Sequence, residues 1–353
     1  MIDRRTALTG IGTAATLGLG TRAMAAPTGQ AVRRATKPQR LHPGETIGLV
    51  APAGFVADRF GIDELDATVR AMGLVPKFAS NLLDRHGYLA GTDEVRAAAL
   101  NAMFRDRQVR AIFAVRGGWG CERILPLLDF RPLAEDPRLL IGSSDITALL
   151  LAAAARTGCP SVHGPNVASS WNAAAWDAFR KLVFDAGMPT YTIGSVGGGG
   201  AEDRLVPRAS RIRTFRPGTA RGRLLGGNLS VLSAMVGTPW LPDFTGAILF
   251  LEETNEAEYR IDRMLSQLAL SGILGKVAGV IFGQCTNCAN PGEPYGNFTV
   301  FEVLEHHLGR LGVPAFQGAQ IGHIPGQVSI PVGIEAEIDA STGTIRILEP
   351  VVS

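Results

Sequence analysis

Short uninterrupted hydrophobic runs alternate with longer amphipathic stretches between residues 46 and 163. Runs of this length are typical of strands that are buried on both faces, whereas apolar residues spaced three and four apart are typical of helices. The expected strands are residues 46–52, 109–115, 139–141 and 161–163, and the expected helices are residues 62–72, 94–104, 122–128 and a segment that starts at Asp145. This alternation predicts a parallel sheet with helices on both faces.

The alternation of hydrophobic runs and amphipathic stretches weakens between about residues 164 and 219 and resumes from residue 220. The weak region holds four consecutive glycines at residues 197–200 and one expected helix at 173–184, which is typical of a connection between domains. The second half is expected to hold strands at 247–251 and 277–282, a helix at 259–270, and short β segments near 320 and at 328–331, 335–338 and 344–348.

These patterns predict an α/β protein of two domains. An N-terminal parallel-sheet α/β domain, residues 44–165, is followed by an inter-domain connection, residues 166–219, and by a second, C-terminal domain, residues 220–353. In parallel sheets, ligands bind beyond the C-terminal ends of the strands. The turns that follow Val115 and Ile141 lie at such ends.

The first 25 residues have the pattern of an export signal. Arg4 and Arg5 precede a short apolar stretch, which ends in the small-residue sequence Ala23-Met24-Ala25. The paired arginines predict a twin-arginine signal peptide, residues 1–25, and a folded protein exported to the periplasm; the alternative is an ordinary secretory signal. The stretch is too short and too glycine-rich for a stable membrane span. Residues 26–43 are expected to form a flexible lead-in.

Composition adds few constraints. The 353 residues are 46% hydrophobic and 19% charged, which is enough for a large core, and the net charge of +2 does not suggest a nucleic-acid partner. The four cysteines, Cys121, Cys159, Cys285 and Cys288, allow three pairings. Cys285 and Cys288 are spaced as in a redox pair or half a zinc site, but neither the following helix nor a second pair is present. A disulfide or two plain thiols is expected, with no metal or cofactor.

Ser144 stands in the turn Gly142-Ser143-Ser144-Asp145, between a predicted strand and a predicted helix. Several hydrolases present a nucleophilic hydroxyl on such a nucleophile elbow, where the helix N-terminus favours developing negative charge. The alternative interpretation is an ordinary helix cap.

A nucleophilic serine needs a base, and the base needs an orienting acid. His323 lies in an apolar loop that is rich in glycine and proline, and Glu252 ends a buried strand, while Glu253 is expected on the opposite face. The alternatives are a packed loop histidine and ordinary loop acids. The segment Arg116-Gly117-Gly118-Trp119-Gly120 lacks the spacing of a phosphate-binding loop.

Together these segments resemble the LD-carboxypeptidase family of serine peptidases. The resemblance extends from Ile47 to about Pro350. It is carried by the glycine loop 116–120, the serine turn 142–147, the turn 226–229, the segments 250–253 and 259–265, and Gly322-His323.

The resemblance implies a Ser-Glu-His triad formed by Ser144, Glu252 and His323. The family's fold would place the serine in the N-terminal α/β domain, and the other two residues in a smaller, β-rich C-terminal domain. Two departures matter: Ser143 stands where the family usually has an aromatic residue, which makes it a rival nucleophile, and Trp119 replaces a usual tyrosine.

For this chemistry we expect the backbone N–H groups of Gly118 and Asp145 to form the oxyanion hole. Arg116 is expected to bind the substrate carboxylate, beside Trp119 as a second substrate-binding residue.

The activity implied by the resemblance is hydrolysis of the L,D-amide bond to terminal D-alanine in murein tetrapeptides. The expected partner is therefore a murein-derived peptide, and a homodimer is a further possibility. Alternatives are hydrolysis of an amide in a peptide–nucleotide antibiotic and a non-catalytic periplasmic binding protein. A metal hydrolase is disfavoured because the sequence has no H-E-x-x-H pattern.

Overall fold

The computed structural model describes residues 37–192, 212–289 and 297–353. The predicted signal peptide, residues 1–25, and the glycine run, residues 197–200, lie outside these ranges.

The start of the described chain is packed against its end. Leu41 is buried, and its N–H donates to the Val183 carbonyl at 2.8 Å. The Arg40 N–H donates to the carbonyl of Ser353 at 3.0 Å, and Lys37 pairs with Glu349 at 2.8 Å. Residues 37–43 therefore differ from the expected flexible lead-in, because apolar burial and these hydrogen bonds hold them in place.

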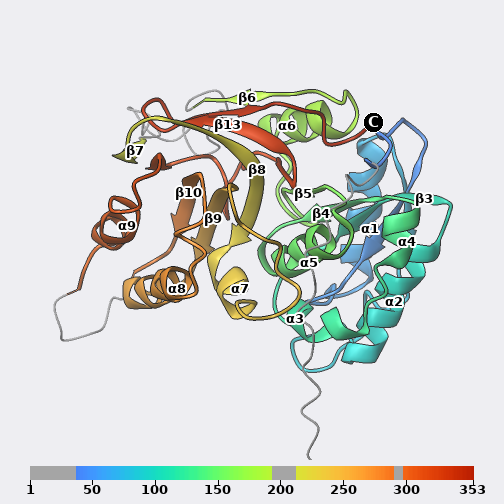
Figure 1. Ribbon diagram of the computed structural model, residues 1–353. Helices are drawn as coiled ribbons and strands as arrows, with labels where there is room; N and C mark the ends of the chain where they lie inside the picture. The colour runs from blue at the N-terminus through green and yellow to red at the C-terminus, as the bar shows by residue number, and fades with distance from the viewer. Residues whose placement is uncertain (1–36, 193–211, 290–296) are drawn as a thin grey trace, which may run out of the picture. The chain divides into compact units, whose positions relative to one another are not determined.

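The first sheet holds the predicted parallel strands. Its order is β12-β5-β4-β3-β1-β2, and the five strands from the N-terminal half are all parallel (Figure 1). The sequences of β1, β3 and β4 are nearly continuously hydrophobic and buried, as strands covered on both faces require, whereas the edge strand β2, which was not predicted, is exposed or half-buried. The strands are β1 (Thr46–Val50), β2 (Val75–Phe78), β3 (Val109–Ala114), β4 (Leu139–Gly142) and β5 (Ser161–His163).

Helices alternate with these strands along the chain. The N-caps follow from the sequence: Asp58 accepts from the Gly61 N–H before α1, and Thr92 accepts from the Val95 N–H before α2. The helices of this half are α1 (Arg59–Ala71), α2 (Asp93–Arg105), α3 (Cys121–Ile124), α4 (Arg131–Glu135), α5 (Thr147–Thr157) and α6 (Ala173–Val183), with 3₁₀ turns η1 (Leu125–Leu127) and η2 (Ser144–Ile146).

The second sheet has the order β6-β14-β13-β8-β9-β10-β11-β7. Its four strands from β8 to β11 are parallel, and antiparallel strands extend it on both sides. The strands are β6 (Thr190–Tyr191), β7 (Arg213–Arg216), β8 (Thr219–Asn228), β9 (Ile248–Thr254), β10 (Gly279–Thr286), β11 (Ala315–Gln317), β13 (Glu335–Asp339) and β14 (Thr344–Ile347). The helices of this half are α7 (Leu229–Ala234), α8 (Glu258–Leu270) and α9 (Val300–Leu308).

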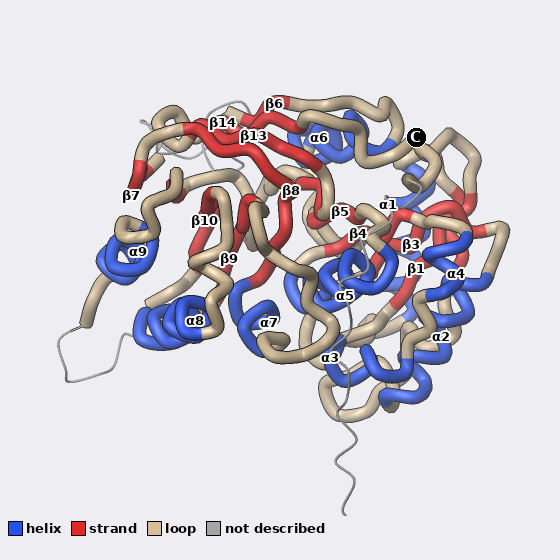
Figure 2. Tube along the Cα trace, viewed as in Figure 1, coloured by secondary structure: helices blue, strands red, loops and turns tan. Residues whose placement is uncertain are grey.

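Two features connect the halves. Strand β12 (Ile330–Val332) comes from the C-terminal half but pairs antiparallel with β5, the strand beside β4 in Figure 2, at the edge of the first sheet. Gly227 of β8 lies so close to Thr147 of α5 that an added Cβ would come within 2.4 Å of the threonine hydroxyl. The Asn228 N–H also donates to this hydroxyl at 3.0 Å. The C-terminal end of β8 is thus held against the start of α5.

Some elements differ from the sequence-based expectation. The expected helix 122–128 is divided into α3 and η1, because Pro126 lacks the N–H that a continuous helix needs. The β segment expected near residue 320 lies at Ala315–Gln317. The expected connection, 166–219, contains α6, whose Phe179 stacks on Phe113 of β3 at 5.5 Å between ring centroids. Among the described residues, no helix has the length and hydrophobicity needed to cross a bilayer.

Candidate active site

Ser144 occupies a strained backbone position at the end of β4. Its φ of 64° is in the left-handed region, which residues other than glycine rarely adopt. The backbone opposite is glycine: a Cβ on Gly117 would lie 2.8 Å from the Ser144 Cβ and 3.0 Å from its Oγ. Such strain persists only where the surroundings impose it, and it is typical of a nucleophile elbow.

The neighbouring Ser143 is in a different environment. It is buried, it is not among the residues that line the pocket beside Ser144, and its N–H donates to Asn166 Oδ1 at 3.2 Å. Of the two serines, the geometry presents Ser144 to a ligand.

Two buried charged residues, Arg96 and Asp145, anchor the glycine loop. Arg96 donates to the Gly120 carbonyl at 2.9 Å and to the Pro52 carbonyl. Asp145 accepts a hydrogen bond from the Cys121 N–H at 2.9 Å. Gly120 has a φ of 98°, and a Cβ at this position would lie 2.8 Å from a Leu89 methyl. The loop and the serine turn therefore form one interlocked unit.

Glu252 and His323 meet at the opposite side of the pocket. His323 Nδ1 donates to Glu252 Oε2 at 2.8 Å, and the Glu252 side chain is fully buried at the C-terminal part of β9. Gly322 has a φ of 125°, and an added Cβ at this position would lie 3.1 Å from the Glu252 side chain, so glycine lets the histidine loop pass close to the glutamate. The Thr286 hydroxyl donates to the His323 carbonyl at 3.1 Å and fixes this loop to β10.

The pKa of His323 is raised from its usual value. Burial alone favours the neutral ring and lowers the pKa, but the hydrogen bond and negative charge of Glu252 outweigh burial, with a further contribution from Glu253. A ring with a raised pKa accepts a proton more readily, as a general base must.

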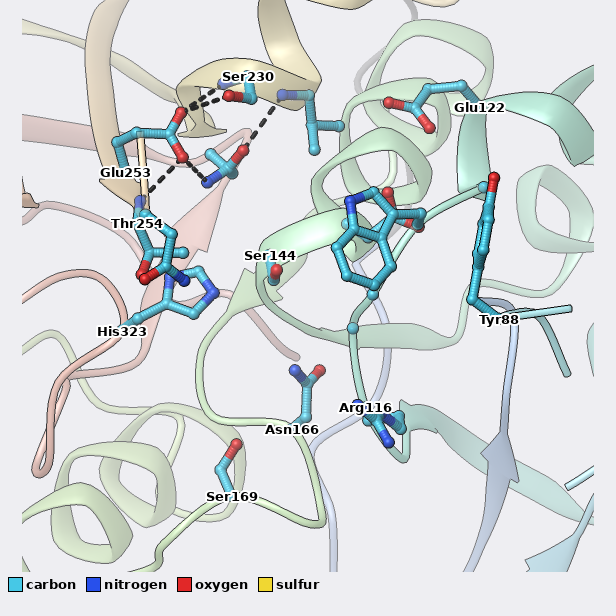
Figure 3. A pocket seen from close by; sticks show the side chains of 18 of the residues that line it. Tyr88, Arg116, Glu122, Ser144, Asn166, Ser169, Ser230, Glu253, Thr254 and His323 are labelled. Atoms are coloured by element: carbon cyan, nitrogen blue, oxygen red, sulfur yellow. Dashed lines mark hydrogen bonds between the residues drawn. The ribbon is translucent and has the colours of Figure 1, made fainter. Parts of the chain in front are cut away.

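The two sides face a pocket of about 920 Å³. Figure 3 shows Ser144 between two groups of side chains. One group is His323 and Glu253, and the other is Tyr88 and Glu122. In the described part of the chain, no direct hydrogen bond joins Ser144 to His323. Catalytic hydrogen bonds are often long in ligand-free enzymes and shorten when substrate binds.

The remaining predicted site residues lie in the same pocket: Gly118, Asp145, Arg116 and Trp119 all line it. Arg116 donates to the carbonyl of Phe55 at 3.3 Å. The Trp119 ring is 67% exposed and contacts Tyr88 edge to face, with 5.7 Å between centroids. The indole is thus available to a ligand.

Sequence reasoning missed a polar network around Glu253. Its carboxylate accepts from Asn228 Nδ2 at 3.1 Å, from the N–H and hydroxyl of Ser230 at 2.8 and 2.7 Å, and from the Thr254 N–H at 2.8 Å (Figure 3). Burial raises the pKa of Glu253, although these hydrogen bonds oppose the shift. The sequence shows the turn Gly226-Gly227-Asn228, but no local pattern indicates that Asn228 contacts Glu253, which lies 25 positions later.

Three further pocket residues were also missed, Tyr88, Glu122 and Asn166. Of these, Asn166 could have been predicted from the sequence, because it follows the C-terminal end of β5 and ligands bind beyond such strand ends.

His163 lies behind the pocket. Its ring is completely buried and meets Phe250 edge to face at 5.5 Å. Within the described ranges, neither ring nitrogen has a hydrogen-bond partner, and the same holds for Glu252 Oε1. Burial lowers the pKa of His163 to about 4, against the opposing charge of Glu252. The ring is therefore neutral at pH 7.

Neither a metal site nor a disulfide is present among the described residues. They contain no group of three or more histidine, cysteine or acidic side chains that could hold a metal ion. All four cysteines are free thiols, so Cys285 and Cys288 are a pair of thiols rather than a disulfide.

Comparison with known proteins identifies the family. The chain matches the LD-carboxypeptidase N-terminal domain over residues 47–164 and the C-terminal domain over residues 221–338. A putative carboxypeptidase of Streptomyces coelicolor is 39% identical over 330 residues, covering 90% of this chain and 98% of the relative. A probable murein peptide carboxypeptidase of Bacillus subtilis is 35% identical, covering 87% and 93%.

Solved structures agree with this assignment. The structure of MccF, a protein of Escherichia coli, in complex with glutamyl sulfamoyl guanosine superimposes with a TM-score of 0.78 at 25% identity, covering 91% of this chain and 100% of that one. These similarities favour an enzyme over the binding-protein interpretation. With a strained serine in its pocket and both domains of the family along its length, this chain belongs to the LD-carboxypeptidase family of serine-type peptidases.

Proposed function

We propose that this protein hydrolyses the amide bond between the L-centre of a diamino acid and the terminal D-alanine of murein tetrapeptides. One observation carries the proposal: Ser144, strained at a φ of 64°, shares a pocket with His323, whose Nδ1 is bound to the buried Glu252. The similarity to a probable murein peptide carboxypeptidase supports the substrate class.

The proposed reaction proceeds through an acyl-enzyme. Because Nδ1 of His323 is bound to Glu252, Nε2 remains to take the proton as Ser144 Oγ attacks the carbonyl carbon. The C–N bond then breaks, and the imidazolium returns that proton to the leaving amine of D-alanine. A water molecule, deprotonated by the same ring, hydrolyses the ester and frees Ser144. Small closure of the pocket on the substrate is needed to join Ser144 to His323.

The backbone N–H groups of Asp145 and Gly118 are proposed to stabilise the negative oxygen of the tetrahedral intermediates. Both residues line the pocket beside Ser144. Loss of one donor of this kind costs on the order of 10²–10³ in turnover. Arg116 is proposed to bind the terminal carboxylate, because a guanidinium pairs with a carboxylate through two parallel hydrogen bonds.

The decisive experiment is mass spectrometry of defined tetrapeptides incubated with the purified protein. We expect release of D-alanine and a tripeptide, together with loss of this release in Ser144→Ala. Ser143→Ala is the matched control, because that adjacent serine is buried away from the pocket. Unchanged release by Ser144→Ala would remove Ser144 from the mechanism, and no release by the unaltered protein would contradict the proposed function.

Hydrolysis of a peptide–nucleotide amide is the second candidate. It is favoured by the likeness to MccF with a sulfamoyl nucleoside and by the exposed Trp119 ring, on which a base could stack. Incubation with an aminoacyl sulfamoyl nucleoside distinguishes the two, since cleavage of this compound without release of D-alanine would favour the second candidate.

The proposed location is the periplasm, reached through the twin-arginine signal of residues 1–25. Cell-wall peptides are directly accessible there. Replacement of both Arg4 and Arg5 by lysine should retain the protein in the cytoplasm, as fractionation would show. Export that persists after this change would instead indicate the ordinary secretory signal.

A further inference from the structure

Glu122 is a half-buried carboxylate on the pocket wall that faces His323 across Ser144 (Figure 3). It stands in the first turn of α3, directly after the glycine loop. Among the described residues, no ion pair or hydrogen bond to another side chain engages its carboxylate.

The arginine next to Glu122 in the chain and the arginine that holds the glycine loop both have other partners. Arg123, the next residue, pairs with Asp93 at 2.8 Å. Arg96 also pairs with Asp93 and donates to two backbone carbonyls. Neither guanidinium is therefore available to compensate Glu122.

The other acids of the pocket differ from Glu122 in this respect. Glu253 accepts four hydrogen bonds, Asp145 accepts from the Cys121 N–H, and Glu256 lies 3.6 Å from Arg260. Burial raises the pKa of Glu122, and the negative charge of Asp145 raises it further. Both effects disfavour a carboxylate that lacks a cation, so a ligand that brings one would be stabilised at this point.

The pocket offers an unpaired group of the opposite charge as well. Within the described chain Arg116 pairs with no carboxylate, and it lines the same pocket at a distance from Glu122 (Figure 3). A ligand that suits both groups carries a carboxylate and, elsewhere, an ammonium group. A tetrapeptide that ends in D-alanine and holds a diamino acid has both.

We propose that Glu122 is the subsite for the free side-chain ammonium group of the diamino acid, so that the enzyme selects tetrapeptides in which this amine is not acylated. This inference rests on the proposed function. In cross-linked murein the same amine forms a neutral amide, which leaves Glu122 without a cation. Peptides released from cross-links would then be the preferred substrates.

The test compares two substrates that differ only at this amine: a lysine-containing tetrapeptide and its ε-N-acetyl derivative. We expect the unaltered enzyme to favour the free amine in kcat/KM by at least about tenfold, the usual effect of a hydrogen bond between charged groups. Glu122→Gln should lose this preference by slowing only the free-amine substrate. Glu256→Gln is the matched control and should keep the preference, because that pocket acid already has a cation.

Charge reversal separates recognition from a structural role. Glu122→Lys should favour an ε-N-succinyl tetrapeptide, whose added carboxylate complements the new ammonium group. Equal cleavage of the free and acetylated substrates by the unaltered enzyme would overturn the inference while leaving the proposed function intact. An equal loss on both substrates in Glu122→Gln would overturn it too. Failure of the unaltered enzyme to release D-alanine from either substrate would instead contradict the proposed function.

Discussion

The pocket has a serine wall, formed by the serine turn and the glycine loop, and a histidine wall, formed around His323 and Glu252. The two walls hold their residues in place by different means. On the serine wall the backbone holds the site in place. Ser144 has a left-handed backbone conformation, the facing Gly117 leaves no room for a Cβ, and Arg96 anchors the glycine loop. On the histidine wall side chains hold the site in place: the His323 ring donates a hydrogen bond to Glu252, and the His323 carbonyl accepts one from Thr286. Catalysis should therefore be sensitive to added side-chain volume on the serine wall, and to loss of charge and to pH on the histidine wall.

The largest effect is expected from Glu252→Gln. The amide preserves volume but removes the charge and allows the wrong tautomer of His323, and comparable changes in serine proteases lower kcat on the order of 10⁴-fold. Steady-state kinetics of D-alanine release would measure it. Activity within tenfold of the unaltered enzyme would show that the Glu252–His323 bond is structural only.

Gly117→Ala tests the serine wall. The new Cβ would lie 2.8 Å from the Ser144 Cβ, so the serine turn must shift, and a displacement of about 1 Å can cost 10²-fold in turnover. Gly275→Ala is the control, because the nearest atom there is 3.7 Å away. If both variants keep full kcat, the close approach of Gly117 does not position Ser144.

His163 should make stability depend on pH. Its pKa is about 4 when buried and about 6.5 in the unfolded chain, so the unfolded state binds the extra proton between these values. The stabilisation is complete above pH 6.5 and falls by about 3 kcal/mol as the pH drops to 4. Urea unfolding of His163→Phe should show a correspondingly weaker decline over that range. An identical decline in both proteins would contradict this assignment.

The smallest effect concerns the acid limb of the pH–rate profile. The raised pKa of His323 places the midpoint of kcat/KM above pH 6.5, and activity should fall about tenfold per pH unit below that midpoint. Measurement of kcat/KM between pH 5 and 9 tests this. A midpoint below 6.5 would mean that burial lowers the pKa of His323 more than Glu252 raises it. The histidine wall would then be less polar than its contacts indicate.

Local sequence predicted the serine wall better than the histidine wall. Hydrophobic runs marked the parallel strands that are buried on both faces but not the exposed edge strand β2, and the Gly142 turn before a helix marked Ser144. The contact of Glu252 with His323 spans 71 positions, and no local pattern encodes it. It was predicted only through resemblance to a family.

The residues that sequence reasoning missed depend on tertiary placement. Glu122 is an ordinary acid of a first helical turn until the fold turns it into the pocket and leaves it without a cation. Similarly, the β segment expected at 328–331 forms the three-residue strand β12, but no local pattern indicated its pairing with β5, which lies far earlier in the chain. Strands this short are weak signals, because their stability comes from the sheet that they join.

The position of β12 also constrains how the protein acquires its shape during synthesis. The edge strand that completes the first sheet is residues 330–332 of 353, and the terminal Ser353 bonds to Arg40 near the other end. The nucleophile-bearing sheet cannot finish assembling until residues 330–332 have left the ribosome. A chain stalled before Ile330 should therefore remain sensitive to proteases and inactive, even though Ser144 and its whole elbow have already been translated.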